Sequence, residues 1–334
     1  MNTIKFSNIN DMRKETNNVE IYDINDIIID DIKYKYYTNA QISLYVTKKC
    51  NGNCWFCMNN YEKRFCQSIE LDDENYFYNI DRMLDNFEKI KPPITITGGE
   101  PTKDKKLITI IRKIHNRGFR TRTFATNGTG LFDRYEGKTI ITHLLENGVI
   151  NNINVSRMTV DDKQNKRIMG VNQSNADIKT IFTYGNTNGM DIRLSCNLQK
   201  DGVKNLDDIL KYVNFYSDLE VNTIMFRELI SIKDASKYYN DRIINIEPIF
   251  NEIESNEEFE FLRTLEGMYY IVKVYRYKDR LVKCYQEKVN HNIENSVIRE
   301  FVFYPDGNLD KGWNKDNNIV LKFEDKHKKN GVIK

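Results

Sequence analysis

Three cysteines lie within one short segment of the sequence, at Cys50, Cys54 and Cys57. Thiolates at this close spacing can hold three irons of a [4Fe–4S] cube and leave the fourth iron without a protein ligand. Zinc ribbons need two CxxC pairs, and ferredoxins carry a fourth cysteine before a proline. The CxxxCxxC spacing therefore favours an open cube. Cys66 is a further thiol along the chain, and it keeps zinc open as an alternative.

A second motif follows the cysteines, with Gly98, Gly99, Glu100 and Pro101 directly after Thr97. Two glycines at the end of a strand let a ligand approach the backbone, because no Cβ stands in the way. Alone, the pair indicates only a tight turn between a strand and a helix. Next to the cysteine segment it favours a ligand site, in which Glu100 orients the turn.

These motifs need strands to position them, and the sequence supplies a suitable pattern. Short apolar runs alternate with amphipathic stretches, which is typical of repeated βα units and a parallel sheet. Apolar residues at helical spacing predict helices around 76–87 and 107–114, the second ending before Gly118. We predict strands at 42–46, 94–97, 120–125, 153–156, 192–196 and 223–227, which would form an α/β fold, a (βα)6 partial barrel of the TIM type.

Three regions are predicted along the chain. Residues 1–40 form an N-terminal cap with a hairpin around 19–22 and 32–37, and residues 41–232 form the partial barrel. Residues 233–334 form a C-terminal α+β appendage that caps the substrate. Within this appendage we predict strands at 269–275 and 298–304 and a turn at 305–308.

Composition narrows the possible functions. The 334 residues are 40% apolar and 29% charged, which allows a sizeable core, and no segment is apolar and long enough for a membrane span. The net charge of +2 gives no strong signal for nucleic-acid binding. The N-terminus lacks the apolar stretch of a secretory signal, and clustered cysteines suit a reducing compartment. We therefore expect a cytoplasmic protein.

Together, the cysteine segment, residues 41–47 before it, the closing pair Cys57-Met58 and the Gly-Gly-Glu-Pro motif resemble the radical S-adenosylmethionine (radical SAM) enzymes. The pattern is most similar to the GTP cyclase of molybdenum-cofactor biosynthesis, over roughly residues 40–232. The resemblance implies one [4Fe–4S] cluster on Cys50, Cys54 and Cys57 and SAM on the open iron. It also implies a flavodoxin- or ferredoxin-type electron donor, reductive cleavage of SAM to a 5′-deoxyadenosyl radical, and abstraction of a substrate hydrogen.

The resemblance further implies residues that contact SAM. For two of these positions the sequence leaves a second interpretation: Thr126-Asn127 as an Asx-type turn, and Arg157 as a surface arginine. The implied SAM contacts are Gly98, Gly99, Glu100, Thr126, Asn127, Ser156, Arg157 and Arg193.

Other residues are candidates for contact with the substrate. Arg227 and Glu228 close the sixth predicted strand, where they either touch substrate or pair with each other. Cys284 either returns a hydrogen atom to a substrate radical or is a small buried hydrophobe, and Cys196 is a weaker candidate of the same kind.

The sequence departs from the cyclase pattern near its C-terminus. The cyclase binds a second cluster through three C-terminal cysteines, but Gly312-Trp313 stands where one of them would be. A second cluster would lack ligands, so GTP cyclisation by the cyclase's binding mode is not expected. Three functions stay open. The first is a radical SAM enzyme that acts on a nucleotide, sugar or natural-product precursor. The second is a radical SAM enzyme that crosslinks or epimerises a ribosomally synthesised peptide, and the third is a non-enzymatic iron–sulfur redox sensor.

Overall fold

The computed structural model describes residues 23–230, 232, 235–266, 270–287, 297–313 and 318–329. The chain divides into two compact units, each of which we describe by itself. The cysteine unit comprises the described residues of Tyr22–Ser156, Lys166–Ile192 and Glu294–Lys334. The arginine unit comprises those of Arg157–Asn165 and Arg193–Ile293. The predicted region boundaries at residues 40 and 232 stay predictions.

The cysteine unit is built on a sheet with the strand order β7-β4-β3-β2-β13-β14-β15. Strand β1 pairs with β2 as an antiparallel hairpin, the five strands β13, β2, β3, β4 and β7 run parallel to one another, and β14 and β15 continue the sheet from β13 with antiparallel pairing. A separate small hairpin joins β5 and β6. The bounds of these strands are β1 Ile24–Ile29, β2 Ile32–Tyr45, β3 Ile94–Thr97, β4 Thr121–Thr126, β5 Arg134–Tyr135, β6 Lys138–Thr139, β7 Ile153–Ser156, β13 Val297–Phe303, β14 Leu309–Lys311 and β15 Ile319–Leu321.

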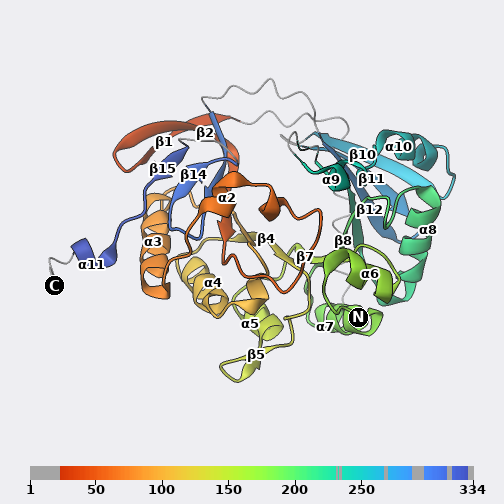
Figure 1. Ribbon diagram of the computed structural model, residues 1–334, viewed down its shortest axis with the longest axis horizontal. Coiled ribbons are helices and arrows are strands. Elements are labelled where there is room, and N and C mark those ends of the chain that lie inside the picture. Colours follow the sequence, from red (N-terminus) through yellow and green to blue (C-terminus); the bar gives the residue numbers. More distant parts are fainter. Residues whose placement is uncertain are drawn as a thin grey trace. The chain divides into compact units, whose positions relative to one another are not determined.

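Helices cover one face of this sheet. Tyr76 and Phe87, from α3 and its C-cap, pack edge-on against Phe303 and Phe301 of β13. These two phenylalanines lie beside Leu44 and Ile42 in the parallel register, and all are buried. Figure 1 shows α3, α4 and α5 following one another along this unit. The helices are α2 Lys63–Gln67, α3 Asp73–Asn86, α4 Lys106–Asn116, α5 Ile140–Glu146, α7 Asn175–Thr187 and α11 Lys326–Lys329, while the residues of α6 Asp162–Met169 are divided between the two units at Asn165.

The opposite face of the sheet, which we call the inner face, is more polar. Side chains alternate along a strand, so Gln41 and Ser43 point away from Ile42 and Leu44. Thr95 lies beside Ser43 in the register and donates a hydrogen bond to Gln41 Oε1 at 3.2 Å. Glu300 of β13 is paired with Gln41 and shares this face.

The arginine unit contains five strands in the order β8-β9-β12-β11-β10. Strands β8, β9 and β12 are parallel, and β10, β11 and β12 form antiparallel hairpins. Figure 1 shows α8 and α10 on one side of β10, β11 and β12. On that side, Tyr275 bonds Glu254 of α10 and Tyr277 bonds Asn214 of α8. The bounds are β8 Ile192–Asn197, β9 Thr223–Arg227, β10 Phe259–Glu266, β11 Tyr270–Tyr277, β12 Arg280–Glu287, α8 Leu206–Phe215, α9 Lys237–Asn240 and α10 Glu247–Glu254.

Most predicted elements are confirmed. The strands predicted at 94–97, 153–156 and 223–227 have the predicted bounds, and the helices around 76–87 and 107–114 are α3 and α4. Gly118 follows α4 with φ of +73°, as expected of a helix-terminating glycine. The predicted N-terminal hairpin exists but is displaced: its first strand is Ile24–Ile29, while residues 19–22 lie outside the described part of the chain. No helix among the described residues could cross a membrane.

Candidate functional site

The cysteine segment follows β2 and is held by backbone contacts. The Asn53 N–H donates to Met169 O at 2.8 Å, and the Gly52 N–H points to Cys50 Sγ at 3.2 Å. Cys50 is exposed, whereas Cys54 and Cys57 are half-buried. The loop thus presents one accessible and two partly shielded thiols from the same short stretch.

Burial and mutual repulsion control the ionisation of these thiols. Burial first, and then the neighbouring Cys57 and Cys50 thiolates, raise the pKa of Cys54 to about 12. The pKa of Cys57 is also raised, first by burial. A metal must therefore displace protons from these thiols when it binds.

The donor set fits an open iron–sulfur cube. Three soft sulfur ligands interact electrostatically with one another. A cube binds each thiolate at a different iron, so it needs wider spacing than a single tetrahedral ion. Within the described ranges, no three His, Cys, Asp or Glu side chains surround a single ion position. Cys66 is exposed and its thiol contacts Asn59 O at 3.1 Å.

The two glycines lock the β3 end against the cysteine segment. The Gly99 N–H donates to Thr47 O and the Glu100 N–H to Lys49 O, both at 2.8 Å. A Cβ added to Gly99 would lie 2.0 Å from Lys49 O, and one on Gly98 would lie 2.9 Å from Thr47 O. Gly98 also has φ of +125°, where other residues are strained. Close packing on the cysteine segment thus requires both glycines.

Glu100 is a buried carboxylate with a complete set of protein partners. It accepts hydrogen bonds from the backbone N–H and hydroxyl of Thr102, the hydroxyl of Thr126 and the backbone N–H of Asn127. Its exposure is 1%, and burial raises its pKa. Glu100 therefore ties the end of β3 to the end of β4. The geometry supports the predicted orienting role and leaves little carboxylate surface for a ligand.

The predicted turn at the end of β4 is confirmed. Asn127 Oδ1 accepts from the Thr129 N–H at 3.0 Å, as in an Asx turn, and Asn127 Nδ2 donates to Asn51 Oδ1 at 2.9 Å. Gln173 Nε2 donates to the carbonyl oxygens of Asn127 and Ser156, which joins the ends of β4 and β7. The SAM contacts predicted for Thr126, Asn127 and Ser156 stay predictions.

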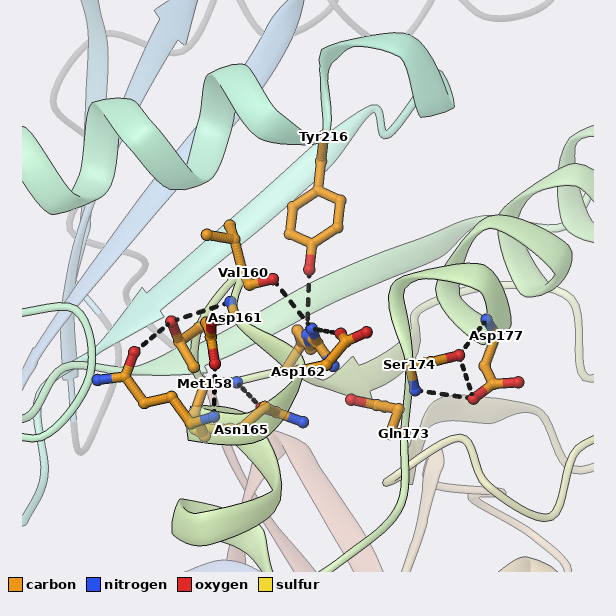
Figure 2. A network of polar contacts seen from close by, with 12 residues as sticks. Met158, Val160, Asp161, Asp162, Asn165, Gln173, Ser174, Asp177 and Tyr216 are labelled. Atoms are coloured by element: carbon orange, nitrogen blue, oxygen red, sulfur yellow. Dashed lines mark hydrogen bonds and ion pairs between the residues drawn. The ribbon is translucent and has the colours of Figure 1, made fainter.

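Arg157 belongs to the arginine unit and is completely buried. Its guanidinium donates to the Tyr216 hydroxyl at 3.0 Å, Val160 O at 3.3 Å and Asp162 Oδ1 at 2.5 Å, and these three groups converge in Figure 2. The interpretation of Arg157 as a surface arginine is wrong, because this network needs the guanidinium inside the protein. Its predicted contact with SAM stays a prediction.

The remaining charged candidates have defined surroundings in the same unit. Arg193 lies on the half-exposed face of β8, whose other face is buried. Arg227 stacks over Tyr285 at 4.3 Å. Glu228 accepts from the backbone N–H groups of Ile246 and Glu287 at 3.1 and 2.9 Å. Arg227 and Glu228 thus contact other groups, and the predicted alternative of a pair between them is wrong.

Both strand cysteines are fully buried, and burial raises the pKa of Cys284 to about 12. Cys284 lies beside Phe226 and Lys273 in the sheet. Phe226 contacts Tyr212 of α8, and Lys273 bonds Glu254 of α10, so these side chains face the helices. Cys284 shares that face, which favours the buried-hydrophobe interpretation over a hydrogen donor.

The structure brings one group of predicted residues together in a single unit. Two contributors were not predicted, Asn51 and Gln173, because their partners lie far away in sequence and no local spacing marks them. Arg157, Arg193, Arg227, Glu228 and Cys284 belong to the arginine unit. The cysteine unit contains Cys50, Cys54, Cys57, Gly98, Gly99, Glu100, Thr126, Asn127 and Ser156.

Sequence comparisons agree with the motifs. A family model described as the radical SAM superfamily matches residues 44–213. A "Probable GTP 3',8-cyclase" of Saccharolobus islandicus is 26% identical over 199 residues, covering 59% of this chain and 60% of that protein. One of Pyrococcus abyssi is 29% identical over 222 residues, covering 65% of each. The chain thus spans about 60% of the length of the first of these curated relatives.

Solved structures show the same fold. Streptococcus suis SuiB matches with a TM-score of 0.53 at 16% identity, covering 82% of this chain and 60% of that one. SuiB bound to its precursor peptide SuiA matches with a TM-score of 0.52 at 17% identity and the same coverage. The fold is a mixed α/β structure with a parallel sheet core, similar to the radical SAM partial barrels. Because the family model covers half of the 334 residues, this chain belongs to the radical SAM superfamily, whose enzymes use a [4Fe–4S] cluster and SAM.

Proposed function

We propose that this protein cleaves SAM reductively and uses the resulting 5′-deoxyadenosyl radical to remove a hydrogen atom from a small-molecule substrate. One observation carries the proposal. The segment with Cys50, Cys54 and Cys57 is locked to the Gly98-Gly99 turn by two backbone hydrogen bonds and by contacts too close for any Cβ. A cluster loop and a ligand-binding strand end are thereby held in one fixed arrangement.

Each motif has an assigned task in this proposal. Cys50, Cys54 and Cys57 hold the cluster, while the ends of β3, β4 and β7 position SAM through Gly98, Gly99, Thr126, Asn127 and Ser156. When bound, the cluster and SAM supply the electron transfer and the radical. Glu100 and Gln173 act as positioning residues, because they tie these three strand ends together. Arg193, Arg227 and Glu228 are proposed to lie near SAM or substrate.

A nucleotide, sugar or natural-product precursor is the proposed substrate class. The names of the curated relatives support a nucleotide, although the aligned region is only part of those proteins. A peptide substrate is the second candidate, favoured by the fold shared with SuiB, which was crystallised with a precursor peptide. We further propose a flavodoxin- or ferredoxin-type electron donor and a cytoplasmic location, which suits free cysteines.

The test is reductive SAM cleavage by anaerobically reconstituted protein. With dithionite and SAM, we expect methionine and 5′-deoxyadenosine, and faster 5′-deoxyadenosine formation when the true substrate class is added. GTP and other nucleotides form one arm, and candidate precursor peptides form the other. If a protein with a complete cluster released neither product, the proposal would be wrong and a redox sensor would be favoured.

A further inference from the structure

A nearly buried carboxylate lies on the inner face of the cysteine unit. Glu300 of β13 has an exposure of 6%. It accepts hydrogen bonds from Gln41 Nε2 at 3.0 Å, from the Ser43 hydroxyl, and from Trp313 Nε1 at 2.6 Å.

The partners of Glu300 leave part of its binding capacity unused. A carboxylate offers about four lone-pair positions, and Gln41 and Ser43 share Oε1 while Trp313 occupies one position on Oε2. All three partners are neutral donors. No arginine, lysine or histidine within the described ranges forms an ion pair with Glu300. Glu100, also a buried carboxylate, has four protein donors, whereas Glu300 has three, so Glu300 has one acceptor position and its negative charge to offer a ligand.

The site is connected to the cysteine segment through aromatic side chains. The Trp313 ring packs edge-on against Tyr45 at 5.7 Å, and the Tyr45 hydroxyl donates to Asn59 Oδ1 at 3.1 Å. Asn59 follows Cys57 by two positions, and β2 carries Gln41 and Ser43 directly toward the cysteines. Glu300 therefore lies in the cysteine unit, on the strand next to β2, and β2 leads directly into the cysteine segment of the proposed radical site.

We propose that Glu300 is a substrate-binding residue that accepts a hydrogen bond from a cationic nitrogen, an ammonium or guanidinium group of the substrate. A charge-assisted hydrogen bond to Oε2 would use the remaining lone pair and balance the buried charge. This inference rests on the proposed function for the existence of a substrate, and it adds the chemical class of one substrate group. Trp313 and Ser43 hold the carboxylate in place for that contact.

The test is calorimetric titration of cluster-loaded, SAM-bound enzyme with matched probes. Nα-acetyl-L-argininamide (argininamide below) has a guanidinium as its only cation, Nα-acetyl-L-citrullinamide (citrullinamide below) has a neutral urea of nearly the same shape in its place, and GTP carries neutral base N–H groups. We expect argininamide to bind at least about tenfold more tightly than citrullinamide. We expect Glu300→Gln to abolish that difference. Ser43→Ala and Trp313→Phe each remove a neutral donor but keep the charge of Glu300, so both should retain the preference for argininamide.

Several outcomes would overturn the inference. These are equal binding of argininamide and citrullinamide, binding of argininamide that Glu300→Gln leaves unchanged, and no binding of argininamide at all. Glu300-dependent binding of GTP in its place would overturn the cationic class. If Glu300→Gln does not fold, loss of the preference in Trp313→Phe decides against it. Because the readout is binding, a failure to form 5′-deoxyadenosine in the same preparations would count only against the proposed function.

Discussion

Glu100 illustrates how a motif residue can serve a ligand site without offering its own charge to the ligand. Its carboxylate receives four hydrogen bonds from Thr102, Thr126 and Asn127, which belong to two different strand ends. A buried carboxylate whose hydrogen-bond partners all belong to the protein stabilises the fold, here by linking the ends of β3 and β4. The sequence predicts its location beside Gly98 and Gly99, but only the fold reveals its partners.

Replacing Glu100 with alanine should therefore destabilise the whole unit. We expect the free energy of unfolding to fall by about 2–3 kcal/mol, since several buried donors lose their acceptor. Urea unfolding measures the change. Glu74→Ala is the matched control, because Glu74 is exposed and its ion pairs with Lys326 and His327 lie at the surface. A loss for Glu100→Ala no larger than that of the control would contradict the assigned role.

The three predicted cluster ligands should differ from Cys66 in their effect on the iron content of the protein. Cys50→Ala, Cys54→Ala and Cys57→Ala should each lose most of the iron and the visible absorption of a reconstituted cluster. Each variant keeps only two of the three thiolate ligands, which are too few to bind a [4Fe–4S] cube stably. Cys66→Ala should keep both, although its thiol is also exposed and close in sequence. Iron analysis and absorption spectra after anaerobic reconstitution give the answer. Equal iron loss in Cys66→Ala would indicate four thiol ligands, which excludes an open corner.

Strands and turns were predictable where the signal is local. The apolar runs that became β3, β7 and β9 are short and bounded by turn residues, so their limits could be predicted. Strand β2 runs without a break from Ile32 to Tyr45, so it joins the hairpin strand predicted at 32–37 to the strand predicted at 42–46. The linking residues 38–41 are mostly polar, and hydrophobic alternation alone does not mark them as strand. The β5–β6 hairpin was missed since each strand has only two residues.

The contact between the β3 turn and the cysteine segment can be tested through Gly99. Alanine there would place Cβ 2.0 Å from Lys49 O, which forces the two backbones apart. We expect a loss of about 2–3 kcal/mol in unfolding free energy together with reduced iron incorporation. Gly137→Ala is the control, because its Cβ would meet open space and only its φ of +81° carries a cost of about 1–2 kcal/mol. Full iron loading of Gly99→Ala would show that this packing does not position the cluster loop.

The C-terminal region shows what a single sequence cannot supply. Its strands β11 and β13 were predicted, but their partners were not: β11 pairs with β10 and β12, whereas β13 pairs with β2. In the pairing of β13 with β2, the paired residues are more than two hundred positions apart in the sequence. Such long-range contacts produce no periodic pattern of residues that a sequence analysis could detect. Arg64 of α2 reinforces the pairing of β13 with β2, because it forms ion pairs with Asp306 and Asp310, which follow β13 in the chain. Strands β13 to β15 of the predicted C-terminal region are thus part of the sheet of the cysteine unit.

Removal of β13 and everything after it should consequently abolish folding of the cysteine unit. A chain ending at residue 296 would lose the fully buried Phe301, Val302 and Phe303, each contributing about 1.5–3 kcal/mol, against a typical net stability of about 5–15 kcal/mol. It would also expose the unpaired edge of β2, which favours aggregation. A chain ending at Asp325 is the control, because it keeps β13 to β15 and loses mainly the exposed Lys326–Glu74 pair. Circular dichroism during heating should show a cooperative transition for the control and none for the shorter chain. A cooperative transition with normal iron binding in the shorter chain would mean that β13 is an accessory to the sheet and not one of its structural strands.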